Sequence, residues 1–480
     1  MKFTLAAAEL ELAQRMKTVG KRWYPRFHLA GRAGWINDPN GLIFHDGWYH
    51  AFYQHHPYGT AWGPMHWGHA RSKDMLHWEQ LPVALTPEGA EDKNGCFSGS
   101  AVIYDGKMAL IYTGNKFEGD STSDDDLYQV QCLATSNDGI HFDRHGIIID
   151  TPPGVHHFRD PKVWQEGDRW YMVVGVSKAG VGHIHLYSSS DLKEWQDEGI
   201  LAAAPDSQMG FMWECPDFFR LGDKYVLVFS PQGLARDGYD YVNLYQSGYI
   251  IGSWSPGKPF QQETPFIEMD LGDSFYAPQT FLAEDGRRIL IGWMVMWDSY
   301  LPESRDGWAG QLTLPRELSL NDRQDRLVQR PIRELSSLYQ NSHHHHYTLK
   351  NQQTVVCSMC QHEDIVVRLS TQAAAEEYGL SLGEGLRVYI DSQAKRVVVE
   401  RNYAEYGLVG KRSVPLPDSE HTELRLIIDN SSLELFVNQG ESVVSTRFYP
   451  DESISAHELR AFAWGGTAQL DIERKELVIT

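Results

Sequence analysis

The chain has 480 residues, which at about 150 residues per domain predicts two or three domains. Hydrophobic residues make up 42 % and charged residues 22 %, proportions typical of a folded globular protein, so a disordered chain is excluded. The formal net charge of −21 opposes binding to nucleic acid. No apolar stretch reaches the roughly 18 residues that a membrane span needs.

The first segment, residues 1–24, is predicted to be an N-terminal helical extension. Leu5, Leu10 and Leu12 follow helical spacing. Two glutamates interrupt the apolar core that an export signal would need, so we expect a short surface helix. Five scattered cysteines disfavour a disulfide framework. We therefore expect a cytoplasmic protein.

Five segments between residues 25 and 325 share one pattern, an apolar strand, a tight glycine turn and a second apolar strand. The turn glycines are separated by 59, 61, 55 and 64 residues and are Gly47, Gly106, Gly167, Gly222 and Gly286. A hairpin fills about half of each interval, which leaves room for two more strands. Four strands repeated radially form a propeller blade. The sequence therefore predicts an all-β fold with a five-bladed β-propeller over 25–325, rather than a sandwich or a two-domain α/β protein.

The pattern changes after residue 325. Residues 326–346, which contain the run His343–His346, are predicted to be a linker. From 347 to 480 several strand-like runs alternate apolar and polar residues, which predicts a C-terminal β-sandwich. The histidine run and the nearby Cys357 and Cys360 lack the spacing of a zinc site, so no metal is expected. The acidic run Asp124–Asp126 is interpreted as a solvated loop.

A polar residue stands at the start of the inner strand of each repeat. These residues are Asp38, Ser98, Asp160, Glu214 and Tyr276. Equivalent positions of a radial repeat converge on one mouth of the central channel, so we expect them to face one another. Crowded carboxyl groups raise one another's proton affinity, and glycoside hydrolysis uses one carboxylate and one carboxylic acid. The alternative is that Asp38 and Asp160, which both precede proline, simply begin turns.

The same residues lie in recognisable motifs. These are Trp35-Ile36-Asn37-Asp38-Pro39-Asn40-Gly41, Phe97-Ser98-Gly99-Ser100, Arg159-Asp160-Pro161 and Glu214-Cys215-Pro216-Asp217. Together they resemble the signature set of glycoside hydrolase family 32, and the resemblance extends over nearly the whole chain. Within the family it points to bacterial invertases and sucrose-6-phosphate hydrolases. The one visible departure is Ile36, where methionine is usual.

The resemblance implies retaining hydrolysis of β-D-fructofuranosides, without a cofactor. Asp38 would be the nucleophile that attacks C2 of the fructosyl unit, and Glu214 the general acid and then the general base. Asp160 would bind fructose hydroxyls and stabilise the transition state, with Arg159 holding it ionised. The fructose pocket would be lined by Asn37, Gln54, Trp62, Phe97, Ser98, Arg159, Tyr276 and Trp297.

Several alternatives stay open at this point. The same acids serve furanosidases that act on arabinans or xylans, although the Trp35–Gly41 stretch argues against them, and they also serve fructosyltransferases. A non-catalytic sugar-binding propeller is the alternative outside enzymes. The sequence does not choose between sucrose and sucrose 6-phosphate as the small-molecule partner. It also leaves open whether the chain forms a homodimer.

Overall fold

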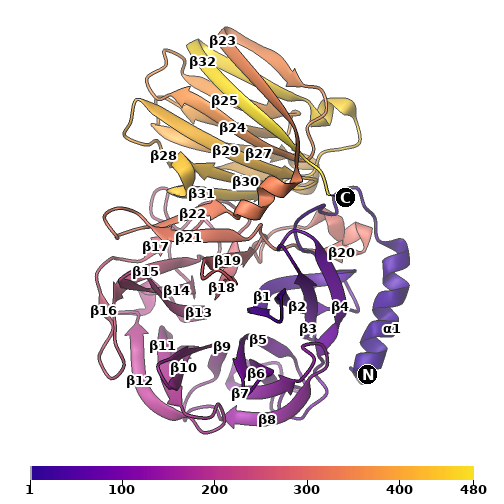
Figure 1. Ribbon diagram of the computed structural model, residues 1–480, viewed down its shortest axis with the longest axis vertical. Helices are drawn as coiled ribbons and strands as arrows, with labels where there is room; N and C mark the ends of the chain where they lie inside the picture. The colour runs from indigo at the N-terminus through magenta and orange to yellow at the C-terminus, as the bar shows by residue number, and fades with distance from the viewer. Residues whose placement is uncertain (1–2, 480) are drawn as a thin grey trace.

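The computed structural model describes residues 3–479 and is built almost entirely of strands. Five sheets form a ring, and a larger sheet assembly stands beside it (Figure 1). The inner strands of the ring contact one another in the order β1, β5, β9, β13, β18 and back to β1, which closes the circle. These observations confirm the predicted all-β class and the five-bladed propeller.

Successive strands of each blade pair in antiparallel fashion. Blades 1 and 2 comprise β1 (Gly34–His45), β2 (Trp48–His56), β3 (His66–Ser72) and β4 (Trp78–Leu85), then β5 (Cys96–Tyr104), β6 (Lys107–Phe117), β7 (Leu127–Ser136) and β8 (Asp143–Ile149). Blade 3 comprises β9 (His157–Glu166), β10 (Arg169–Lys178), β11 (Val181–Ser189) and β12 (Gln196–Ala203). Blade 4 comprises β13 (Met212–Leu221), β14 (Lys224–Gln232), β15 (Gly248–Ser253), β16 (Gln261–Gln262) and β17 (Ile267–Glu268). Blade 5 comprises β18 (Tyr276–Leu282), β19 (Arg288–Trp293), β21 (Arg316–Leu320) and β22 (Leu327–Pro331).

The ring is closed at blade 1 by pairing between an early and a late segment of the chain. The short strand β20 (Trp308–Ala309) pairs in parallel with the start of β1, so a late segment of the propeller completes the first blade. All five predicted turn glycines have positive φ and lie between the first two strands of their blades. Glycine takes this conformation without steric cost, which is why the hairpins form where the repeat predicted them.

The C-terminal assembly is a β-sandwich whose inner faces bury one apolar core. Its strands are β23 (Tyr339–Cys357), β24 (Glu363–Ser370), β25 (Glu377–Leu382), β26 (Leu386–Asp391), β27 (Arg396–Tyr403), β28 (Leu408–Pro415), β29 (His421–Asp429), β30 (Ser432–Val437), β31 (Ser442–Arg447) and β32 (Leu459–Leu477). The long strand β32 pairs with β23 and β24 and, on the other side of Gly465 and Gly466, with β25. It therefore belongs to both layers.

The prediction that residues 326–346 form a linker is wrong, because these residues form regular secondary structure. The segment consists of β22, the 3₁₀ turn η5 (Arg333–Leu338) and the start of β23. The run His343–His346 pairs with Asp471–Arg474 of β32, with alternate histidines exposed and half-buried. Four identical polar residues show no period-two pattern, so the strand was not visible in the sequence.

The N-terminal helix α1 (Leu5–Arg15) packs on the outside of blade 1 (Figure 1). Thr4 caps it by accepting a hydrogen bond from the Ala7 amide, and Ala8 and Leu12 are buried beside Val83 of β4. The remaining helical elements are the 3₁₀ turns η1 (Met16–Thr18), η2 (Asp124–Asp126), η3 (Ser207–Met209), η4 (Pro302–Asp306), η6 (Ala404–Tyr406), η7 (Asn438–Gly440) and η8 (Ile454–His457). Within residues 3–479, none of the helices has the length and apolar character to cross a membrane.

A buried charge network joins the two domains. His28, just before the propeller, contacts Asp429 Oδ2 through Nδ1 at 2.8 Å and Glu434 Oε1 through Nε2 at 2.7 Å, and both carboxylates belong to the sandwich. Arg316 of β21 pairs with the same Glu434 at 2.6 Å and with Asp270 at 3.0 Å. Burial opposes the charged imidazole, but the two carboxylates outweigh it and raise the pKa of His28 to about 9.

This network predicts a pH-dependent stability. The pKa of His28 is higher folded than unfolded, so its contribution is fully present below about pH 6.5 and is lost as the pH rises through about 9. We expect His28→Gln to lower the free energy of unfolding by about 3 kcal/mol at pH 6. The variant should also lose less stability than the wild type as the pH rises toward 9. Urea midpoints measured from pH 6 to 9.5 check this. The exposed His421→Gln serves as a control, and an H28Q midpoint equal to that of H421Q would contradict the assignment.

Candidate active site

A cavity of about 380 Å³ lies at the mouth of the propeller, where the inner strands begin. Asp38 of β1, Asp160 of β9 and Glu214 of β13 all line it, as the shared position in the repeat predicted. Asp38 is 9 % and Asp160 6 % exposed, so both carboxyl groups are largely removed from water. Residues up to 176 positions apart, from Asp38 to Glu214, are therefore brought to one hollow.

A β-bulge on each inner strand turns these side chains into the cavity. The pairing register shifts between Ile36 and Pro39 on β1, and equivalent shifts occur on β5, β9, β13 and β18. Asp160, Cys215 and Ala277 each precede a proline and have φ of 70°, 47° and 52°. Bulges of this kind re-aim side chains next to functional sites. In blade 4 the residue with positive φ before the proline is Cys215, which is the structural equivalent of Asp160 in blade 3. Glu214 therefore lies one position earlier on its strand than Asp160 does on its own.

Two side chains donate hydrogen bonds to Asp38. Ser98 Oγ lies 2.6 Å from Oδ2, and Asn37 Nδ2 lies 3.1 Å from Oδ1. Trp35 Nε1 in turn donates to Asn37 Oδ1 at 2.8 Å, which fixes the orientation of that amide. Burial, followed by the charge of Glu214, raises the pKa of Asp38 to about 6, and the bonds from Ser98 and Asn37 oppose the rise.

Asp160 shares a neighbour with Asp38. The Cys215 thiol lies 3.4 Å from Asp38 Oδ2 and 3.5 Å from Asp160 Oδ2, and the Cys215 amide donates to Asp160 Oδ2 at 2.9 Å. The Asp160 amide donates to Thr113 Oγ1 of blade 2 at 3.0 Å. Burial and the charge of Glu214 raise the pKa of Asp160 to about 7, against the opposing charge of Arg159.

Arg159 is engaged differently from the prediction. Its Nε and Nη2 both donate to Glu214 Oε1, at 3.0 and 2.7 Å, and no hydrogen bond to Asp160 is found within the described chain. Glu214 Oε2 accepts from Tyr276 Oη at 2.6 Å and Gln232 Nε2 at 3.1 Å. Arg159 therefore acts on Asp160 only through its charge, which lowers the pKa of that carboxyl as expected but does not outweigh burial and the charge of Glu214. Because Glu214 is one residue out of phase with Asp160, its carboxylate is the one that reaches the guanidinium.

A polar layer lies beneath the cavity and ties the blades together. Gln279 Nε2 of blade 5 donates to the Gly99 carbonyl of blade 2 at 2.9 Å, and its Oε1 accepts from the Leu42 amide of blade 1 at 3.3 Å. Asp217 Oδ2 of blade 4 accepts from the Thr280 amide at 2.7 Å. Gln279 thus joins blade 5 to blades 1 and 2, and Asp217 joins blade 4 to blade 5, so the inner strands that carry the acids are tied to one another.

Nearly every predicted pocket residue lines the cavity. Asn37, Gln54, Trp62, Phe97, Ser98, Arg159 and Trp297 do so directly, whereas Tyr276 lies behind Glu214. Further residues that the repeat did not predict also line the cavity, namely Asn115, Phe117, Leu127, Gln129, His157, Gln232, Leu244 and Tyr245. His157 precedes Arg159 by two positions on β9, so strand alternation could have found it. The others lie on second and third strands and on loops, whose register the repeat does not fix.

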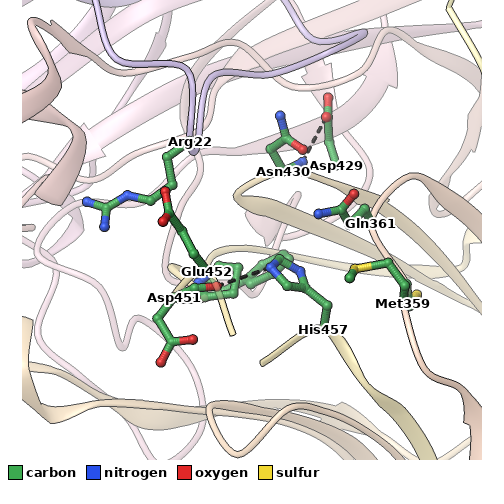
Figure 2. Close-up of a pocket in the computed structure, with 11 residues that line it drawn as sticks. Arg22, Met359, Gln361, Asp429, Asn430, Asp451, Glu452 and His457 are labelled. Carbon is green, nitrogen blue, oxygen red and sulfur yellow. Dashed lines mark hydrogen bonds between the residues drawn. The ribbon is translucent and has the colours of Figure 1, made fainter. Parts of the chain in front are cut away.

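A second cavity, of about 200 Å³, lies where the N-terminal segment meets the sandwich (Figure 2). Arg22, Asp451, Glu452 and His457 line it, and His457 Nε2 bonds the Asp451 carbonyl at 3.1 Å. Its buried carboxylate, Asp429, already accepts hydrogen bonds from His28 and from the Arg26 amide. The other two acids of this cavity, Asp451 and Glu452, are exposed neighbours on one loop. The propeller cavity brings together two buried aspartates and Glu214 from three different blades, so it is the candidate active site.

The chemistry of the site is that of carboxyl groups. Among residues 3–479, no three histidine, cysteine or acidic side chains are grouped so as to hold a metal ion. All five cysteines carry free thiols. Burial raises the pKa of Cys215 well above its usual value, which keeps this thiol protonated. Two buried aspartates with raised pKa values and a third carboxylate fixed by a guanidinium can divide the roles of nucleophile and proton donor.

Comparison with known proteins points the same way. Residues 28–331 match the glycosyl hydrolases family 32 N-terminal domain, and residues 334–476 match the C-terminal domain. A sucrose-6-phosphate hydrolase of Escherichia coli is 50 % identical over 468 residues, covering 97 % of both chains. A raffinose invertase of Escherichia coli is 48 % identical over 472 residues, covering 98 % of both. The solved Bombyx mori GH32 beta-fructofuranosidase is 35 % identical, with a TM-score of 0.85 over 98 % of this chain and 97 % of that one.

Proposed function

The chain belongs to glycosyl hydrolase family 32, and from this premise we propose that it hydrolyses sucrose through a covalent fructosyl–enzyme intermediate. It is a glycoside hydrolase, as its family and its relatives of 50 % and 48 % identity establish. One observation carries the proposal, the meeting of Asp38, Asp160 and Glu214 in a single cavity. The Bombyx mori relative has also been solved in complex with sucrose, and it shares this fold.

In the first step Asp38 attacks C2 of the fructosyl unit while Glu214 protonates the bridging oxygen. Ser98 and Asn37 favour the charged form of Asp38 by donating to its two oxygens. With a pKa of about 6 this carboxyl group is mostly ionised at neutral pH. The same bonds fix its orientation, so that the attacking oxygen is placed before the sugar binds.

Glu214 is positioned by three donors, Arg159, Gln232 and Tyr276. In the second step it takes a proton from water, which then releases fructose from Asp38. Asp160 would bind fructose hydroxyls and stabilise the positive charge that develops at C2. Its raised pKa allows it to donate as well as accept hydrogen bonds near neutral pH.

The curated relatives differ in the substrate that their names state. One name includes a phosphorylated sucrose and the other an uncharged trisaccharide. Transfer of the fructosyl unit to a second sugar instead of water uses the same residues. Measuring free fructose against longer products, with sucrose as the donor, distinguishes hydrolysis from transfer.

The intermediate provides a direct test of the assigned roles. Glu214→Gln should accumulate the adduct when the donor is β-D-fructofuranosyl fluoride, because fluoride leaves without protonation while the base for the second step is missing. Asp38→Asn should show no adduct. Intact-protein mass spectrometry detects the gain of one fructosyl residue, and tryptic mapping places it. Both variants should lose roughly 10²–10⁴-fold or more in kcat on sucrose.

A matched variant guards against a trivial loss of folding. Glu268→Gln changes a half-buried carboxyl group of blade 4 outside the cavity and should form neither more nor less adduct than the wild type. Adduct found on a residue other than Asp38, or wild-type turnover in D38N, would refute the proposed mechanism.

Ser98 provides a test through pH. Its hydroxyl stabilises the charged form of Asp38, so Ser98→Ala should raise the pKa of that carboxyl. The acid limb of the kcat/KM profile should then move to higher pH, by up to about one unit. Ser100→Ala is the control, because Ser100 bonds the backbone of Pro161 and Val163 rather than an acid. An unmoved acid limb in S98A would contradict this role for Ser98.

Two further proposals concern the setting of the enzyme. The five free thiols support a reducing compartment such as the cytoplasm. The small-molecule partner is the sugar substrate, and a homodimer stays a proposal to be tested by light scattering.

A further inference from the structure

Acidic side chains outnumber basic ones around the active-site cavity. The described lining residues include three carboxyl groups, those of Asp38, Asp160 and Glu214, against one guanidinium, that of Arg159. Asp124, in the turn η2 at the tip of the β6–β7 hairpin, adds a fourth carboxylate at the rim. Its side chain is 77 % exposed, so this charge faces the solvent from which substrates arrive.

The guanidinium of Arg159 makes four hydrogen bonds inside the wall. Arg159 donates twice to Glu214, and its Nη1 donates to Gln129 Oε1 at 3.3 Å and to His157 Nδ1 at 2.8 Å. The residue is only 8 % exposed. A phosphate group at the mouth would have to draw Arg159 away from Glu214, the residue that donates the proton.

His157 does not supply a compensating charge. Its Nδ1 accepts from Arg159, so its proton resides on Nε2, which lies 3.4 Å from Asp124 Oδ2. Burial, and next the charge of Arg159, lower the pKa of His157, so the imidazole is neutral at neutral pH. Asp124, His157, Arg159 and Glu214 thus form one connected chain, the rim chain, which begins at an exposed carboxylate on the surface and ends at the proton donor, and its one cation, Arg159, is already paired with Glu214.

The other residues at the mouth are neutral. Trp62 and Leu244, 48 % and 43 % exposed, border the opening, and Phe117, Gln232 and Tyr245 complete it. The neighbouring Lys116 lies on the other face of the β6–β7 hairpin, because side chains alternate along β6. Lys116 lines an outer pocket that shares Phe117 and Leu127 with the cavity, and its ammonium lies 4.7 Å from the ring centroid of Tyr128. Lys93 lines the same pocket and donates to the Gly119 carbonyl.

We propose that the rim chain selects uncharged leaving groups, so that this enzyme hydrolyses sucrose in preference to sucrose 6-phosphate. The inference rests on the proposed function, because the glucosyl unit extends from the bridging oxygen that Glu214 protonates toward the mouth. A phosphate monoester carries about −1.5 to −2 charges at pH 7. It binds well only where charged donors are available to it, and at this mouth carboxylates face it instead.

The test compares kcat/KM for sucrose and for glucosyl-phosphorylated sucrose 6-phosphate with the same full-length enzyme. Coupled assays for glucose and for glucose 6-phosphate report the two products. We expect at least a tenfold preference for sucrose at low ionic strength. The preference should narrow as salt rises, because screening weakens repulsion between the exposed Asp124 and the phosphate.

Two variants with the same change in charge test whether the preference for sucrose depends on Asp124. Asp124→Lys should reduce the preference at least threefold, mainly by lowering KM for the phosphate ester. Asp223→Lys, in the exposed β13–β14 turn of blade 4 far along the strand from Glu214, should leave the ratio unchanged.

The outcomes separate this inference from the proposed function. Equal rates or a preference for the phosphate ester in the wild type would overturn the selectivity while leaving the hydrolase assignment intact. The same shift in D124K and D223K would overturn the role of the rim chain. An enzyme that releases glucose from neither substrate would contradict the proposed function itself.

Discussion

Three carboxyl groups in one largely buried cavity are the constraint around which the propeller is organised. Like charges removed from water raise one another's pKa, as found for Asp38 and Asp160. The fold compensates with donors from neighbouring blades: Ser98 donates to Asp38, the Cys215 amide to Asp160, and Tyr276 to Glu214. Each acid is therefore held by a strand other than its own. Removing one blade would disturb the chemistry of the next, so the closed ring and the reaction depend on each other.

The interface between the domains also contains buried charged groups, but here cations and carboxylates are paired. His28 and Arg316 from the propeller side share Glu434 of the sandwich, and all three side chains are fully buried. A buried ion network adds less net stability than its Coulomb energy suggests, but it penalises any arrangement in which one partner is missing. The relative position of the two domains is thereby specified by pairing rather than by apolar contact alone. The sandwich acts as a structural support, while the residues of the catalytic cavity come from the propeller.

The five blades and the meeting of the three acids could be predicted from the sequence, because the spacing of the repeat fixes which residues occupy equivalent positions in each blade. Turn glycines at intervals of 55–64 residues set the blades, and the residues at equivalent positions then had to converge. The hydrogen-bond partner of Arg159 could not be predicted, because it depends on a one-residue shift. The bulge on β13 places Cys215, not Glu214, in phase with Asp160, so Arg159 reaches Glu214 instead of its sequence neighbour. The strand through His343–His346 was hidden because a uniform run shows no alternation.

The fastening of the ring by β20 has a consequence for how the protein is made. Strand β1 begins at Gly34, yet its parallel partner is Trp308–Ala309, and the Arg26 amide bonds Asp429, 403 positions later. At ribosomal rates that first edge stays open on the order of tens of seconds. An unpaired strand edge is a template for joining with another chain. Nascent copies of this protein are thus most vulnerable to aggregation early in synthesis, and shielding of the first blade by chaperones would matter more than help with any later one.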